Sequence, residues 1–355
     1  MINIMKFILL LLMFSGWAVA LESYSPYASD NIPRNVYFGD THLHTRLSMD
    51  ATPQLEVSSL AGQLSSENAY RFARGETILA LNGMRVRLQR PLDFLVVADH
   101  AENLGVLMSV IKDDPVLLQS RMGEFLYKKF RDPMMILGAL EKRMEAILST
   151  RVSIFDPKYM VKDGIYRKSV WQEVTSQAEK YNQPKKFTAF IGYEWTSWGN
   201  TEPQAGMHRV VVFKDGADKV NQVLPFSAFD SPSPEDLWQY MADYQQKTMG
   251  EILAIPHNAN ISKGKTFSLT DSTGYPFSTA YAETRSRWEP LYEVTQVKGD
   301  SESHPVLSPE DEFADFEIWD SNEVGKGDRN WHAWDNERKE KKKNQYARSA
   351  LKLGL

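Results

Sequence analysis

The 355-residue chain contains no cysteine. This absence excludes disulfides, thiolate zinc sites and cysteine nucleophiles together. The chain also has no basic excess: 41 lysines and arginines stand against 46 acidic residues, and the net charge of -5 argues against a protein that mainly follows nucleic-acid phosphates. With 42% hydrophobic residues, the sequence is too apolar for a disordered chain and too interrupted by charge for a membrane protein with several spans.

One apolar run stands at the N-terminus. Residues 1–20 contain a single charge, Lys6, followed by an apolar stretch and then by small residues up to Ala20. This order is typical of a secretory signal peptide that is cleaved after Ala20. The sequence therefore predicts a signal peptide over 1–20, a mature domain over 21–355 and a periplasmic or secreted location. An uncleaved N-terminal anchor is the alternative.

From residue 36 onward, short apolar runs alternate with longer polar or helical stretches. This pattern predicts an α/β protein whose strands are joined by crossover helices. Most of the runs are apolar throughout, as strands buried on both faces of a sheet must be. The predicted strands cover residues 36–38, 94–97, 187–191, 210–213, 252–255 and 316–319.

Two stretches, about 106–185 and 226–311, look like insertions into this alternation. Within the first, apolar residues recur every three or four positions over 115–150, which predicts amphipathic helices that pack through this stripe. Within the second, Ser233 and Pro234 are the residue types preferred at the N-cap and at the first position of a helix. Because long insertions often shape a binding pocket, we expect substrate choice to lie in these two stretches.

Histidines are placed next to the predicted strands. Five of the seven lie beside a strand, and one glutamate does the same. In a barrel of parallel strands the side chains at the C-terminal strand ends converge on one mouth, and imidazoles together with a carboxylate suit zinc, iron or manganese. Any one of these histidines alone would more often be an ordinary core or surface residue, but their joint placement predicts a metal site. The candidate ligands are His42, His44, His100, Glu194, His208 and His257.

The segments that carry these residues resemble a known family. Residues 37–45, with the sequence YFGDTHLHT, and residues 97–100, with the sequence VADH, resemble motifs I and II of the PHP (polymerase and histidinol phosphatase) superfamily of metal-dependent phosphoesterases. With further motifs, the chain is similar over about 33–355 to the PHP-related domain-of-unknown-function family 3604 (DUF3604). The further motifs lie at residues 70–76, 91–94, 99–105, 190–195 and 256–258.

The resemblance implies a distorted seven-stranded β/α barrel, similar to a TIM barrel, that holds two or three divalent metal ions. It implies that His42 and His44 bind the first ion. Glu194 would bridge the first ion and the second, and His208 and His257 would complete the second site. Zinc, manganese and iron are the metals that this donor set suits.

A third ion is matched less completely. The resemblance implies a site with His100, and Asp50 stands where many PHP proteins carry another histidine. PHP proteins also end their site with an Asp-x-His motif on the last strand, whereas the only such motif here includes His42 and overlaps motif I. The sequence therefore predicts a chain truncated before the last barrel strand. The alternative is an unusual member that recruits another group, such as Asp320.

The chemistry implied by the resemblance is attack on phosphorus by a metal-activated water, with cations that neutralise the phosphoryl oxygens. Three residues in or near the predicted strand-end loops, Arg209, Lys263 and Arg287, are candidates for binding the phosphate. We expect Asp99, next to His100, to accept a hydrogen bond from a ligating ring.

These features predict a metal-dependent hydrolase, a phosphoesterase whose partner is a small-molecule phosphate ester. We expect no nucleic-acid partner and, after cleavage of the signal peptide, no stable membrane span. One alternative is a catalytically silent metal-binding fragment, which Asp50 and the missing Asp-x-His motif favour. The other is a hydrolase of non-phosphate bonds that uses the same metals, because metal centres are reused across chemistries.

Overall fold

The computed structural model of the chain describes residues 35–48, 50–51, 64–130, 159–197, 206–319, 340 and 342–352. The chain divides into two units, Met1–Tyr37 and Phe38–Leu355, and every helix and strand given below belongs to the second. The predicted signal peptide and the middle of the first predicted insertion lie outside the described residues.

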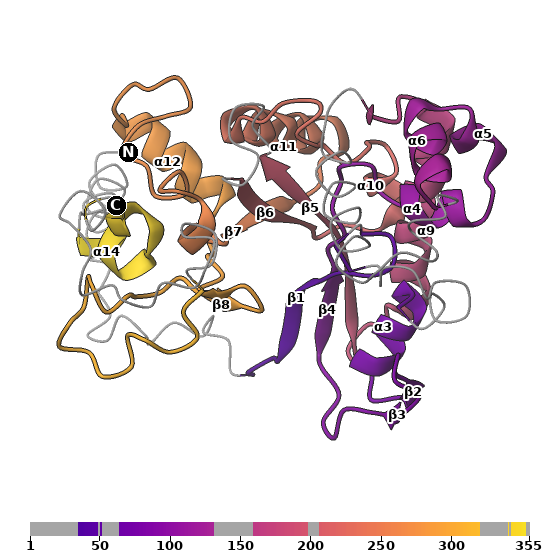
Figure 1. Cartoon of the computed structure of the whole chain (residues 1–355), viewed down its shortest axis with the longest axis horizontal. Helices are drawn as coiled ribbons and strands as arrows, with labels where there is room; N and C mark the ends of the chain where they lie inside the picture. Colours follow the sequence, from indigo (N-terminus) through magenta and orange to yellow (C-terminus); the bar gives the residue numbers. More distant parts are fainter. Residues whose placement is uncertain are drawn as a thin grey trace, which may run out of the picture. The chain divides into compact units, whose positions relative to one another are not determined.

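The apolar runs form one mixed five-stranded sheet with the order β1-β4-β5-β6-β7 (Figure 1). β1, β4 and β5 run parallel, whereas β6 is antiparallel to both β5 and β7. The sheet curls into a half-barrel, and within the described part of the chain no further strand joins it to close the predicted seven-stranded barrel. The strands are β1 Gly39–Leu43, β4 Phe94–Val97, β5 Thr188–Ser197, β6 Met207–Phe213 and β7 Ile252–His257.

The direction of β6 departs from the predicted parallel pattern. Only nine residues, 198–206, separate the end of β5 from the start of β6, and a parallel crossover needs roughly a dozen or more. The chain therefore returns as an antiparallel neighbour. The predicted first strand over 36–38 is displaced, because β1 starts at Gly39. The predicted strand over 316–319 is wrong, since this segment consists of turn and coil and Phe316 is 64% exposed.

Helices cover one face of the sheet. Helix α9 packs against β5, and α11 and α12 pack against β7 and against each other. Helix α11 begins as the sequence predicts: the side chain of Ser233 accepts a hydrogen bond from the backbone N–H of Asp236, and Pro234 is the first helical residue. The α-helices are α3 Ser66–Ala73, α4 Val106–Ile111, α5 Pro115–Leu118, α6 Arg121–Phe130, α9 Gly164–Tyr181, α10 Ala217–Val220, α11 Pro234–Thr248, α12 Thr279–Trp288 and α14 Ala347–Lys352.

Short elements complete the described part of the chain. Two antiparallel ribbons lie outside the main sheet, one made by β2 and β3 and the other by β8 and β9. The second ribbon belongs to the segment that reaches the candidate site. These elements are β2 Ile78–Leu79, β3 Arg85–Val86, β8 Thr295–Gln296, β9 Gly299–Asp300 and the 3₁₀ helices η2 Ala259–Ile261 and η4 Lys343–Gln345.

The two faces of the sheet are filled differently. β6 contributes Phe213 to the main core, which includes Trp171 of α9. Val210 of the same strand belongs to a smaller apolar cluster on the opposite face. Because successive side chains of a strand alternate between faces, His208 shares the face of Val210 and lies away from the helices. The candidate site forms on that face.

We predict that Gly192→Ala destabilises the protein by about 1–3 kcal/mol, as overpacking of a core typically does. A methyl group at Gly192 of β5 would lie 2.4 Å from Cγ1 of Val96 and 2.8 Å from the carbonyl oxygen of Val211. The matched control is Gly164→Ala at the first position of α9, where nothing lies within 4 Å and alanine favours the helix. Thermal and urea unfolding of both variants measure the difference, and equal stabilities would contradict the close packing of β4 on β5.

Candidate metal centre

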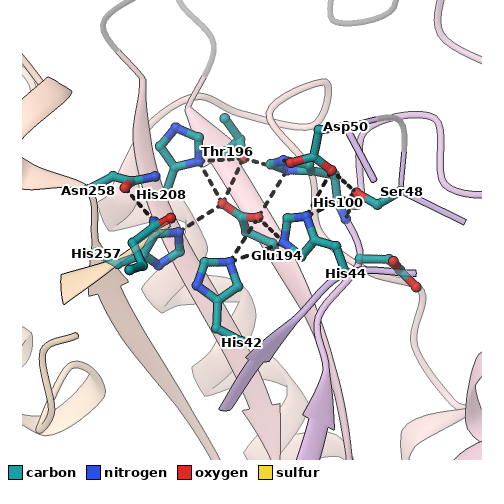
Figure 2. A network of polar contacts seen from close by, with 12 residues as sticks. His42, His44, Ser48, Asp50, His100, Glu194, Thr196, His208, His257 and Asn258 are labelled. Atoms are coloured by element: carbon teal, nitrogen blue, oxygen red, sulfur yellow. Dashed lines mark hydrogen bonds and ion pairs between the residues drawn. The ribbon is translucent and has the colours of Figure 1, made fainter. Parts of the chain in front are cut away.

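Polar side chains from all five strands, or from the residues just after them, meet at one end of the sheet (Figure 2). The register of the sheet brings them together. His208 of β6 stands opposite His257 of β7, and His100, which follows β4, forms an isolated bridge with Glu194 of β5. His42 and His44 are two residues apart along an extended segment, so both rings reach the same region.

Two candidate ligands lie farther inside their strands than the sequence indicates. Glu194 is followed by three more residues of β5, and His208 is the second residue of β6. Because β6 is antiparallel to β5 and β7, its first residues lie at the same end of the sheet as the last residues of its two neighbours. The reversal of β6 therefore explains why a histidine near the beginning of a strand joins residues near the ends of others.

The carboxylate of Glu194 lies at the centre of the cluster and is fully buried. Its Oε1 atom lies 2.6 Å from Nδ1 of His208 and 3.0 Å from Nε2 of His257. Its Oε2 atom lies 2.8 Å from Nε2 of His44 and 3.5 Å from Nε2 of His42. Nδ1 of His100 also lies 3.4 Å from Oε2. The two carboxylate oxygens therefore face different histidines, which is the arrangement expected of a carboxylate shared by two cations.

The distances between donor atoms fit a divalent ion. Nε2 of His42 and Nε2 of His44 are 3.1 Å apart, whereas two tetrahedral zinc ligands at about 2.0–2.1 Å from the ion are separated by roughly 3.3 Å. Oε2 of Glu194 is buried and faces both rings. Among the described residues, four groups whose donor atoms lie within 4.8 Å of one another could hold an ion: His42, His44 and Glu194; His42, His257 and Glu293; His44, Asp50 and His100; and His100, Glu194 and His208.

Asp50 lies on the far side of His44 from Glu194. Its Oδ1 atom is 2.8 Å from Nδ1 of His44, and its Oδ2 atom is 3.4 Å from Nε2 of His100. The hydroxyl of Ser48 donates a hydrogen bond of 2.7 Å to Oδ1 of Asp50 and fixes the orientation of that carboxylate. The structure thus places Asp50 beside His100, which is the pair that the resemblance implies for a third ion.

The charges of the cluster are strongly coupled. Burial disfavours the protonated rings, but hydrogen bonds to neighbouring carboxylates outweigh it and raise the pKa of His42 to about 9 and that of His44 to about 10. Burial also raises the pKa of Glu194, yet the surrounding rings hold that pKa well below its ordinary value. Burial lowers the pKa of His208 to about 4. At neutral pH the metal-free cluster therefore holds protons on His42 and His44, while His208 is neutral.

Glu293 is a member of the cluster that the sequence analysis missed. It precedes β8, and its Oε2 atom lies 2.9 Å from Nδ1 of His42. Since Nε2 of His42 faces His44, a carboxylate on the other ring nitrogen orients the ring and raises its basicity. No sequence motif marks Glu293, because it follows a helix rather than a strand of the sheet.

Lys298 is the second residue that the sequence analysis missed. Together with Asp40, His42, His44, Asp50 and Glu293 it lines a cleft of about 660 Å³. Its Nζ atom lies 3.9 Å from Oδ2 of Asp50, so a flexible cation borders the candidate ligands. The turn between β8 and β9 carries Lys298 to this position, and only the fold reveals it.

The three cations that the sequence suggested for phosphate binding do not line this cleft. Arg209 follows His208 in β6, so its side chain points to the opposite face of the sheet, where Nε donates a hydrogen bond of 2.9 Å to Glu289. Lys263 lines a different cavity together with Arg209. Arg287 of α12 donates a hydrogen bond to the side chain of Gln245. The other suggested ligand, Asp320, lies outside the described residues.

Asp99 has a different contact from the expected one. Its buried carboxylate accepts hydrogen bonds from the backbone N–H and the hydroxyl of Thr45 rather than from a ligating ring. Burial raises the pKa of Asp99, and the two hydrogen bonds from Thr45 offset part of that effect. Asp99 therefore fixes the turn directly after His44 and acts on the cluster through the backbone.

Loading of the metal-free protein with zinc at pH 7 should release about two protons, because coordination requires neutral rings and both His42 and His44 are protonated there. The number released should fall as the pH rises through 9 and 10, since the rings then lose these protons without the metal. Calorimetric titrations in buffers of different ionisation enthalpy count the protons. Zinc binding without proton release at pH 7 would contradict the raised pKa values.

Replacement of the carboxylate beside His42, as Glu293→Gln, should weaken metal binding by about 10–100-fold, the usual cost of losing a carboxylate that orients a ligating histidine. Competition with a chelator of known affinity and the metal content after dialysis give the change. The control is Glu283→Gln on the exposed surface of α12, which should bind metal as the unaltered protein does. Equal affinities in the two variants would exclude Glu293 from the centre.

No helix in the described part of the chain is both long and apolar enough to cross a bilayer.

Comparison with known proteins identifies the family of the chain. No curated protein and no solved structure gives a significant match to the sequence. A family model described as "Protein of unknown function (DUF3604)" matches residues 31–355, which is all of the chain after its first thirty residues. The chain that carries this cluster of histidines and carboxylates therefore belongs to the DUF3604 family.

Proposed function

We propose that the protein is a metal-dependent hydrolase that cleaves phosphate esters of small molecules. The observation that carries this proposal is the buried carboxylate of Glu194 between two pairs of histidine nitrogens, His42 with His44 and His208 with His257. A carboxylate that bridges two ions is typical of centres that activate water for attack on phosphorus. The motif resemblance to the PHP phosphoesterases supports the same reaction.

The proposed centre holds two or three ions of zinc, manganese or iron. His42, His44 and Glu194 would bind the first ion, and Glu194, His208 and His257 the second. A third would lie between Asp50 and His100, close to the second nitrogen of His44. The absence of cysteine leaves only imidazole and carboxylate donors, which suit these three metals.

Bound divalent ions would supply a water of lowered pKa and would polarise the phosphoryl oxygens. The residues of the chain have separate tasks. Glu293 orients the ring of His42, and Asp99 holds the turn after His44, so both rings keep their positions. Lys298 places a positive charge at the cleft, where it would contact a phosphoryl oxygen. A cleft of about 660 Å³ is of the size that holds small molecules.

We also propose that the protein works outside the cytoplasm, in the periplasm or as a secreted enzyme. The support is the order of charge, apolar stretch and small residues over 1–20. A chain without cysteine needs no reducing environment, which is consistent with this location.

The proposal is tested with metal-loaded protein and a panel of phosphomonoesters, phosphodiesters, lactones and amides. We expect metal-dependent hydrolysis of at least one phosphate ester, and Glu194→Gln should lower kcat/KM by at least about 100-fold because it removes the bridging charge. Metal uptake without turnover of any substrate would instead favour a silent metal-binding protein. Turnover of lactones or amides alone would contradict the preference for phosphorus.

Lys298→Met should lower kcat/KM for the phosphate ester by about 10–100-fold, mainly through KM, because a charge-assisted contact to the phosphoryl group is lost. The bound metal should remain, since Lys298 offers no ligand to the ions. The control is Lys168→Met on the exposed face of α9, which should behave as the unaltered enzyme. An unchanged KM in Lys298→Met would show that the substrate does not contact this lysine.

A further inference from the structure

A second cavity of about 590 Å³ lies on the helix-covered side of the sheet. Its lining has a strong excess of positive charge: the charged residues that border it are four cations and a single carboxylate, that of Asp271. Polar loop residues and two aromatic rings make up much of the remaining wall. The cations are Arg209, Lys263, Lys265 and Arg285.

Arg209 borders this cavity and is incompletely satisfied by the protein. Its side chain is 2% exposed, and its Nε atom donates a hydrogen bond of 2.9 Å to Oε1 of Glu289. The Nη1 atom is buried and has no hydrogen-bond partner among the described residues. A guanidinium carries five N–H groups, and leaving a buried charged donor without an acceptor is costly. The arrangement therefore suits an acceptor that comes from outside the chain.

Glu289 does not balance the local charge. Its Oε1 atom accepts hydrogen bonds from Arg209 and from the indole N–H of Trp238, and its Oε2 atom accepts one of 3.1 Å from Nε of Arg285. One carboxylate is thus shared by two guanidinium groups. The nearby arginines hold the pKa of Glu289 below its ordinary value although burial raises it, so the group stays charged. The three side chains together carry a net positive charge at the edge of the cavity.

An aromatic stack lines the same cavity. The rings of Phe277 and Tyr281 are stacked, with centroids 4.2 Å apart and an angle of 22° between their planes. Arg285 is fixed beside them, because its Nη2 atom donates a hydrogen bond of 2.8 Å to the carbonyl oxygen of Thr266. A cationic edge and an aromatic wall together favour a ligand that has an anionic head and a flat or apolar body.

We propose that this cavity binds an oxyanion group, a carboxylate, sulfate or phosphate, carried on a compact aromatic or apolar ligand. The guanidinium groups of Arg209 and Arg285 bind the head, Lys263 and Lys265 attract it, and the Phe277–Tyr281 stack contacts the body. The site is separate from the metal centre, because Arg209 and His208 are neighbours in β6 and point to opposite faces of the sheet. This inference does not rest on the proposed hydrolase activity.

The test is calorimetric titration of the metal-loaded protein with phenyl sulfate, and with benzyl alcohol as a neutral probe. We expect saturable binding of phenyl sulfate that is weakened at least tenfold in Arg285→Gln and in the double variant Lys263→Gln/Lys265→Gln. Both lysines are exposed, so the double variant keeps the fold even where substitution of a half-buried arginine disturbs it. The matched control is Arg287→Gln, whose guanidinium contacts Gln245 outside the cavity, and it should bind phenyl sulfate normally.

Three results would overturn the proposal. They are no binding of phenyl sulfate, equally strong binding of benzyl alcohol, and unchanged affinity in both cavity variants together with loss of binding in Glu194→Gln. The last result would place the anion on the metal ions. Soaking crystals of the metal-loaded protein in selenate gives an independent measurement, because an anomalous peak beside Arg209 supports the site and a peak only among the histidines contradicts it.

Discussion

A carboxylate with no exposure to solvent, that of Glu194, is the constraint on which the rest of the structure depends. A buried charge is unstable unless other groups compensate it, and here five histidines face its two oxygens. Those rings come from β1, β6 and β7 or from the residues after β1 and β4, so the compensation holds only when the strands keep their register. The strand register that shapes the half-barrel is therefore the same register that places the histidines around the charge of Glu194.

Because side chains alternate along β6, the two faces of the sheet present different chemical environments at this strand. His208 lies among the candidate metal ligands, whereas Arg209, the next residue, borders a cavity whose lining has an excess of positive charge. Only the thickness of one strand separates them. Each environment has its own apolar cluster beside it, the main core on the face of Arg209 and the smaller cluster on the face of His208.

Much of the cluster could be predicted from the sequence because its residues stand next to apolar runs. The pair His42 and His44 and the position of His257 after its strand are local patterns. The direction of β6 could not be read from its apolar run, which looks the same in a parallel and an antiparallel neighbour. Glu293 and Lys298 were missed because a segment outside the sheet brings them to the cleft. Arg209 was misplaced because the predicted strand began at residue 210, whereas β6 begins at Met207, and alternation along it puts Arg209 on the face opposite His208.

The candidate ligands are far apart along the chain, and this distance determines when the cluster assembles during folding. His257 is 63 residues beyond Glu194, and Glu293 is 251 residues beyond His42. Contacts between such distant residues form late, because long loops must close first. An incomplete chain leaving the ribosome thus offers no assembled cluster to a passing ion. The proposed metal would therefore be taken up in the compartment in which folding ends, and the ions present there would decide its identity.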